Sequence, residues 1–163
     1  MPSTDTQSPL YISVLDRLVG FGADSGRNPD ANQASGLREL QVAVQRNLVP
    51  LLNTRRMQHP IPLEFEQCNA SLLVFGLPDF TVLSLRDPGD QRRLGQAIEA
   101  AIRTFEPRLS AVSVTPEPRR ELDPVLTYRV EAILDIEPAP EPIVFDTVLQ
   151  ADTGKFSVTG LVK

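Results

Sequence analysis

The sequence predicts an α+β domain, in which N-terminal helices and one long helix pack on a mainly antiparallel C-terminal sheet. Apolar residues recur at every third or fourth position in the first two thirds of the chain and alternate with polar residues after residue 108. Helices that precede a run of strands are typical of the α+β class, and short connections favour antiparallel pairing of the strands. With 163 residues, 41% of them hydrophobic, the chain suits a single domain.

The N-terminal part is expected to contain a tail, a short helix and a linker. Residues 1–9 are polar and are predicted to form a disordered tail ahead of one domain that spans 10–163. Residues 10–19 carry a short amphipathic pattern that two glycines stop. The polar, turn-forming residues 23–35 predict a linker or loop.

A second helix is expected to begin after this linker, with Ser35 as its N-cap. Its apolar residues continue at helical spacing as far as Leu52. Pro50 lies inside this pattern and predicts a kink or a split last turn, because proline removes a helical hydrogen bond. Residues 55–70 contain two prolines and mixed charges, which predict an irregular connection.

The clearest helix of the sequence begins at Pro88. Asp87 is the expected N-cap, and a proline suits the first helical position. One continuous apolar stripe follows, formed by Leu94, Ala97, Ile98, Ala101, Ile102 and Phe105. Pro107 restricts Glu106 to extended geometry, so we expect the helix to end there.

A first strand is expected directly after this helix. We assign Leu109 and Ala111 to one of its faces, and Val112 and Val114 to the other. Pro116 is expected to end the strand, because proline cannot donate a ladder hydrogen bond.

Three further strands are predicted, over 126–136, 143–149 and 156–162, with a tight turn at 152–155. The last two of these strands contain no proline, so they are expected to form or adjoin an exposed sheet edge that exchanges a strand with a partner. Thr159 is expected to face outward on that edge. The alternative is that these two strands simply pair with each other as a closed hairpin.

Composition and charge exclude several classes of protein. A sequence pI near 4.9 and the lack of a basic cluster argue against nucleic-acid binding. The single cysteine, Cys68, and the single histidine, His59, argue against an intramolecular disulfide and against a zinc or multi-histidine metal site. No stretch approaches the ~20 apolar residues of a membrane span, and the N-terminus lacks the basic start of a signal peptide. We therefore expect a cytoplasmic protein without cofactor or metal.

Candidate catalytic residues are few. Catalysis by a Ser-His-Asp or Cys-His group needs a histidine as base, and His59 lies in a proline-rich stretch that favours a solvated side chain. Glycoside hydrolysis needs two carboxylates, for which Glu64, Glu66 and Asp79 are formal candidates. Among 21 acidic residues such a pair is uninformative, and the absence of Trp leaves few surfaces for sugar rings. We assign no catalytic residue and keep a muramidase-like peptidoglycan hydrolase as the alternative function.

Charged residues are unevenly distributed. The stretch from Val130 to Gly154 has no Lys or Arg and carries the acids Glu131, Asp135, Glu137, Glu141, Asp146 and Asp152. By contrast, arginines gather on and just after the long helix, at Arg92, Arg93, Arg103 and Arg108. Two interpretations stay open: solvated faces of strand and helix, or a polarised surface that orients docking between protein subunits.

Five short segments together resemble one family. They are Ser13–Leu18 (SVLDRL), Leu51–Arg56 (LLNTRR), Gly76–Phe80 (GLPDF), Phe105–Leu109 (FEPRL) and Phe145–Thr147 (FDT). In this order they resemble the TssE family of type VI secretion baseplate subunits, which is related to the lysozyme-associated baseplate wedge proteins of contractile phage tails. The resemblance covers roughly residues 11–160, and its most specific segment is the Glu-Pro-Arg run at the helix-to-strand junction.

The resemblance implies a non-enzymatic, cytoplasmic wedge subunit that helps to anchor the contractile sheath where its assembly begins. It implies TssF, TssG and TssK as wedge partners, and the sheath proteins TssB and TssC above them. The expected partner-binding residues lie in the matching segments: Arg55, Arg56, Asp79, Glu106, Pro107 and Arg108. Arg108 offers a bidentate fork for a partner's carboxylate. An internal ion pair with Glu106, which would hold the helix to the sheet, is the alternative.

Overall fold

The computed structural model describes residues 29–58, 61–62, 64–69, 71–118, 125–136 and 139–162. Its elements are, in order, α2 (Pro29–Asn53), α3 (Glu66–Asn69), the 3-10 turn η1 (Leu72–Val74), α4 (Pro88–Phe105), β1 (Leu109–Pro116), β2 (Val125–Leu134), β3 (Glu141–Gln150) and β4 (Phe156–Val162). Helices precede a four-stranded sheet, so the predicted α+β class is confirmed. The expected tail (1–9) and the expected first helix (10–19) lie outside the described residues.

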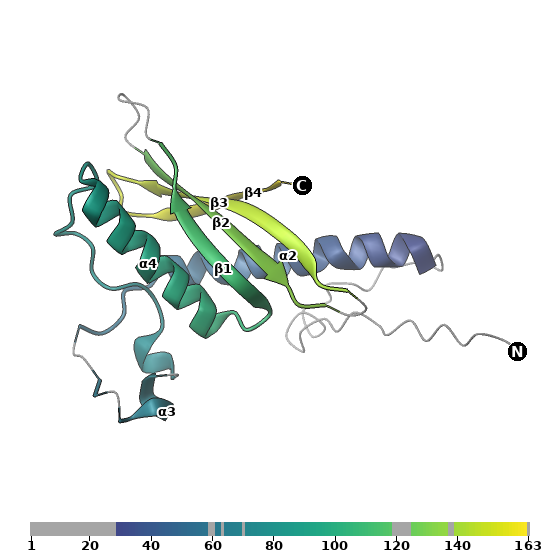
Figure 1. The fold of residues 1–163 in the computed structure, drawn as a ribbon, viewed down its shortest axis with the longest axis horizontal. Helices are drawn as coiled ribbons and strands as arrows, with labels where there is room; N and C mark the ends of the chain where they lie inside the picture. Colours follow the sequence, from purple (N-terminus) through teal and green to yellow (C-terminus); the bar gives the residue numbers. More distant parts are fainter. Residues whose placement is uncertain are drawn as a thin grey trace, which may run out of the picture.

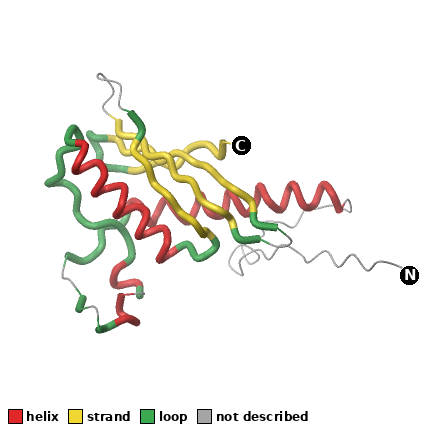
Figure 2. Tube along the Cα trace, in the orientation of Figure 1, coloured by secondary structure: helices red, strands yellow, loops and turns green. Residues whose placement is uncertain are grey.

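The sheet is an antiparallel meander in the order β1-β2-β3-β4, so every strand pairs with its neighbour in the sequence. Helix α4 packs along β1, and α2 packs against β4 and α4 (Figure 1). The segment that carries α3 and η1 projects from this body as a separate lobe, hereafter the 57–75 lobe, and loops join it to α2 and α4 (Figure 2).

One face of the sheet forms the core with the two helices. Along β2, buried residues alternate with residues that are exposed or half-buried, as the period-two pattern predicts. Tyr128 is fully buried and its hydroxyl donates to the Gln91 carbonyl of α4 at 3.0 Å. Gly95 of α4 permits this packing, because a Cβ there would lie 3.4 Å from the Tyr128 ring. Leu48 of α2 and Ile102 of α4 complete the same cluster.

Helix α2 begins earlier than the sequence predicts. Residues 29–35 are helical, so the expected linker over 23–35 is wrong in this part and Ser35 is no N-cap. Pro29 occupies the first helical position, where its missing N–H costs nothing and its fixed φ favours the helix. The helix also continues through Pro50 to Asn53, so the expected split of the last turn is not observed.

Helix α4 forms as the sequence predicts. It begins at Pro88, and the Asp87 carboxylate accepts a hydrogen bond from the Asp90 N–H at 2.9 Å as the N-cap. The predicted apolar stripe faces the sheet, with Leu94, Ile98 and Ile102 buried. The helix ends at Phe105, one residue before Glu106 takes a non-helical conformation as C-cap.

The face assignment of β1 needs a correction. The strand shifts register between Ser110 and Ser113, and Ala111 takes a positive φ of 48°. This bulge puts Leu109 and Val112 on the same, buried side and leaves Ala111 exposed. Strict alternation assigned Ala111 to the side of Leu109, and it fails because a bulge inserts one extra residue.

Candidate functional site

The bend between α4 and β1 holds a buried ion pair. Arg108 donates from Nε and from one terminal nitrogen to the two carboxylate oxygens of Glu106, at 2.7 and 2.9 Å. The Glu106 side chain is only 4% exposed and that of Arg108 is 25% exposed. Asn47 of α2 adds a third donor to the carboxylate at 3.3 Å. The internal pairing left open by the sequence is therefore present, and it connects α4, β1 and α2.

Pro107 gives this bend a fixed shape. It stands exposed between the paired residues, and it prevents α4 from continuing. The Glu106 N–H still donates to the Ile102 carbonyl at 2.8 Å, and the Glu106 carbonyl accepts from the Leu109 N–H at 3.0 Å. The Arg108 side chain is thus fixed at both ends, by backbone geometry and by a buried carboxylate.

A second group of predicted residues lies where two distant segments meet. The Arg56 N–H donates to the Leu77 carbonyl and the Leu77 N–H donates to the Thr54 carbonyl, both at 2.9 Å. These bonds make a parallel bridge between Arg55 and Leu77. Gly76 takes φ +104°, and a Cβ there would lie 2.4 Å from the Thr54 carbonyl oxygen. Only glycine allows the two backbones to approach this closely.

The Arg55 side chain joins three parts of the chain. Its guanidinium lies 3.9 Å from the centroid of the Phe80 ring, a cation–π contact. One of its nitrogens donates to the Gly154 carbonyl in the β3–β4 turn at 3.2 Å. Phe80 in turn packs edge-on against Phe156 of β4. Arg55 therefore connects the end of α2 with the segment around Phe80 and with the edge of the sheet.

Asp79 is held in its ionised form. The backbone N–H and the hydroxyl of Thr81 both donate to its Oδ1, at 3.0 and 2.8 Å. These hydrogen bonds, helped by the charge of Arg55, lower the pKa of the Asp79 carboxyl. Gln58 donates to its other oxygen at 3.5 Å. An exposed carboxylate of this kind presents a stable negative charge and is unsuited to act as a general acid.

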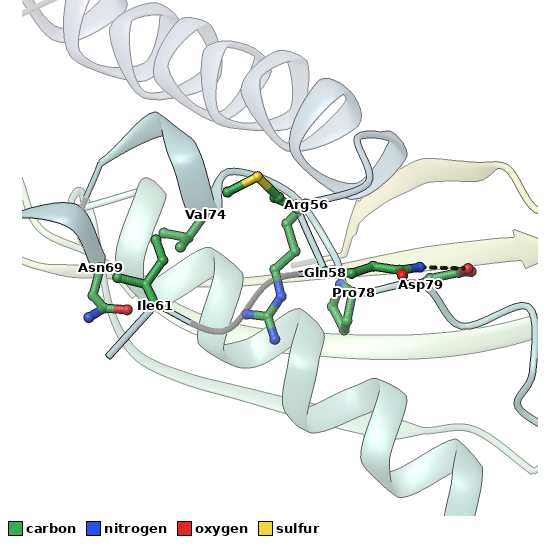
Figure 3. A pocket seen from close by; sticks show the side chains of 8 residues that line it. Arg56, Gln58, Ile61, Asn69, Val74, Pro78 and Asp79 are labelled. Atoms are coloured by element: carbon green, nitrogen blue, oxygen red, sulfur yellow. Dashed lines mark hydrogen bonds between the residues drawn. The ribbon is translucent and has the colours of Figure 1, made fainter. Parts of the chain in front are cut away.

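Arg56 and Asp79 line one hollow of about 420 Å³ on the protein surface. The hollow lies between the end of α2, the 57–75 lobe and Pro78 (Figure 3). Met57, Ile61, Val74 and Pro78 supply its apolar walls, whereas Arg56, Gln58, Asn69 and Asp79 supply its polar groups.

The structure thus forms two groups from the six predicted residues. Glu106, Pro107 and Arg108 form the bend after α4. Arg56 and Asp79 line the hollow, whereas Arg55 lies beside it and contacts Phe80 and Gly154. Helix α2 connects both groups, because Asn47 contacts Glu106 and the chain reaches Arg55 directly after α2 ends.

The β4 edge is capped by amide side chains that sequence reasoning missed. Asn53 Nδ2 donates to the Phe156 carbonyl, and the Phe156 N–H donates to Asn53 Oδ1, both at 2.9 Å. Gln45 Nε2 donates to the Val158 carbonyl at 2.7 Å. Helix α2 thereby occupies the positions that the first residues of β4 would offer to an added strand. No sequence pattern marks these amides, because their partners lie more than 100 residues away.

The structure shows which of the last two strands forms the edge of the sheet. Strands β3 and β4 pair with each other, as the hairpin alternative has it, and β4 is the outer strand. Backbone groups of successive residues point to opposite sides of a strand. Since Phe156 and Val158 point towards α2, Thr159 directs its backbone towards Asp146 of β3. Thr159 is exposed, as the outward-facing assignment expects, but its backbone does not face the open edge of the sheet.

The acidic stretch lies partly on the face of the sheet opposite the helices. There Arg129 of β2 contacts Glu117 at 2.7 Å and Asp146 of β3 at 3.6 Å. This arginine, just outside the acidic stretch in the sequence, offsets part of its charge. Exposed ion pairs of this kind contribute little to stability.

The remaining candidate catalytic and metal-binding residues form no site among the described residues. Glu64 and Glu66 are exposed in the 57–75 lobe, and His59 lies outside the described residues. Within the part of the chain that the structure describes, no three His, Cys, Asp or Glu residues gather as metal ligands. Nor is any helix among the described ranges long and apolar enough to cross a membrane.

Comparison with protein families identifies a family that this chain matches. The model of the family described as baseplate wedge protein gp25 matches residues 38–139. The matched range contains both groups of predicted residues, from the end of α2 to the bend after α4. No curated protein matches the chain.

Proposed function

Because this chain belongs to the family of baseplate wedge protein gp25, we propose that it is a structural subunit of a cytoplasmic type VI secretion baseplate. Family membership supports a structural role in a phage-tail-like baseplate, and it is the observation that carries the proposal. In the proposed role, the subunit belongs to the wedge that anchors the contractile sheath and initiates its assembly.

The proposed partners are the wedge subunits TssF, TssG and TssK and the sheath proteins TssB and TssC. Two described surfaces suit such contacts because each is held rigid by bonds within the subunit. One is the bend at Pro107, where a buried carboxylate holds Arg108 in place. The other is the hollow lined by Arg56 and Asp79. Rigid surfaces lose little conformational entropy when a partner binds.

Of the two surfaces, the bend at Pro107 allows a partner contact to be assigned to particular residues. The Glu106 side chain is only 4% exposed, which leaves little of it for contact with a partner, so its proposed role is to position Arg108. The exposed ring of Pro107 and the accessible part of Arg108 would form the contact itself. Truncating Arg108 is then expected to weaken both the fold and the wedge, whereas Pro107→Ala is expected to weaken chiefly the wedge.

Sheath contact is proposed at the part of β4 that follows Val158. The preceding residues of this strand already bond to Asn53 and Gln45 of α2. A sheath strand that pairs along the edge would therefore begin beyond those amide caps.

The alternative, a peptidoglycan hydrolase, finds no support in the described carboxylates. Of the three formal candidates, Asp79 has a lowered pKa and would be deprotonated at neutral pH, whereas glycoside hydrolysis needs one protonated carboxyl. A turbidity assay on purified cell walls tests this directly. Lysis that Glu64→Gln or Asp79→Asn abolishes would establish the hydrolase instead.

The proposed role is tested in cells that carry a fluorescently tagged sheath. Deleting the gene should abolish sheath assembly, and the wild-type chain should restore it. Fractionation should recover the protein with the cytoplasm. Normal sheath assembly in the deletion strain would overturn the proposal.

A further inference from the structure

The hollow beside the 57–75 lobe combines apolar walls with the guanidinium of Arg56, which has no acceptor among the described residues. Within the described ranges, no hydrogen bond or ion pair engages the Arg56 guanidinium. Figure 3 shows this group pointing into the hollow, between Ile61 and Pro78. Its neighbour Arg55 differs, because Phe80 and the Gly154 carbonyl already occupy that guanidinium.

The other polar groups of the hollow are engaged within the subunit. Asp79 accepts from Thr81 and Gln58. Asn69 donates to the carbonyls of Pro62 and Phe65, both at 3.1 Å. Arg56 therefore has side-chain donors available to a ligand in the hollow, and a carboxylate matches its planar fork of donors.

The surroundings favour a ligand that is also apolar. Met57 on the wall of the hollow is 55% exposed, and the same lobe exposes Phe65, Leu72 and Leu73. Apolar side chains gathered on a projecting lobe are typical of a protein-binding surface.

From these observations we propose that the hollow binds a peptide segment of another wedge protein, which places an acidic side chain against Arg56 and an aliphatic side chain against Ile61, Val74 and Pro78. This proposal rests on the proposed wedge function and names the chemistry of one contact. The bridge between Arg55 and Leu77 makes the site rigid, since it fixes the backbone on both sides of the hollow.

Photo-crosslinking in the assembled baseplate tests the proposal. A benzoylphenylalanine replaces Met57 in the full-length, affinity-tagged chain, and mass spectrometry identifies the linked peptide. We expect one segment of a co-purifying wedge protein, with Asp or Glu within two residues of Leu, Ile, Val or Met. The same crosslinker at Val82, which is 87% exposed and outside the hollow, should not link to that segment.

Reversing the charge of Arg56 gives a second test of the proposal. Arg56→Glu should reduce the crosslink at least tenfold, whereas Arg86→Glu, the same change at an exposed site outside the hollow, should leave it unchanged. Changing the partner's acidic residue to arginine should restore the crosslink to Arg56→Glu. A crosslink to a second copy of this chain, to a segment without an acidic residue, or to nothing would overturn the proposal.

The crosslinking experiment distinguishes failure of this contact from failure of the proposed wedge function. If wedge proteins co-purify but Met57 yields no crosslink, the hollow is not their contact and the wedge function stands. If no wedge protein co-purifies with the wild-type chain, the proposed function fails as well.

Discussion

Replacing Arg108 by alanine should destabilise the protein by about 3 kcal/mol. The change removes both short hydrogen bonds to Glu106 and leaves that carboxylate with the Asn47 amide at 3.3 Å. Breaking a buried ion pair typically costs ~3–5 kcal/mol, because the remaining charge stays desolvated. We take the lower end of this range because the Arg108 side chain is 25% exposed, so water reaches the site.

Urea unfolding followed by circular dichroism measures this loss. In thermal unfolding, about 3 kcal/mol corresponds to a decrease in Tm of roughly 6–12 °C for a chain of this length. The matched control is Arg93→Ala, which removes a 3.5 Å pair from a side chain that is 75% exposed. That change should cost less than about 0.5 kcal/mol.

A double variant separates burial of the charge from loss of contact. Glu106→Leu combined with Arg108→Met removes both charges, so it should recover most of the stability that Arg108→Ala loses. A loss below about 1 kcal/mol in Arg108→Ala would refute the reasoning, because it would mean that water already solvates the Glu106 carboxylate.

Four further predictions follow from the described contacts. Gly76→Ala should cost at least about 2 kcal/mol in urea unfolding, because φ is +104° and a Cβ would lie 2.4 Å from the Thr54 carbonyl oxygen; an unchanged midpoint would contradict the close approach. Asn53→Ala should speed amide exchange at Phe156 and cost ~1–2 kcal/mol, since two hydrogen bonds to β4 disappear. Burial raises the pKa of Tyr128, so its neutral form stabilises the fold below the unfolded pKa of ~10, and this stability is lost as the pH rises further. Absorbance at 295 nm should show the Tyr128 phenol ionising only as the protein unfolds. Ile102→Ala should cost ~2–5 kcal/mol because the side chain is fully buried. A loss well under ~1 kcal/mol would mean that this face of α4 does not pack in the core.

Local signals made much of the fold predictable. The bounds of α4 follow from Asp87 and Pro88 at its start and Pro107 after its end, which act within one turn of the helix. The strand β2 follows from alternation over ten residues, which one buried face requires. Pro29 was missed as a helix start because its polar neighbours favour a turn equally well.

Contacts between distant segments were not predictable in the same way. The resemblance named Arg56 and Asp79 from separate motifs, but no spacing in the sequence indicates that they line one hollow. The bridge that brings them together depends on Gly76, whose isolated position between two apolar residues was the available signal. The amide caps on β4 also escaped, since a polar residue on a helix is ordinarily solvated.

Purification of the assembled wedge shows whether this chain is one of its subunits. The full-length, tagged chain is co-expressed with its proposed wedge partners, and light scattering after size exclusion gives the mass of the complex. We expect one complex that contains this chain together with TssF and TssG. Arg56→Glu and Pro107→Ala should weaken this complex, whereas Arg86→Glu should not. Elution of the wild-type chain alone, with its partners forming a complex without it, would show that it is not a wedge subunit.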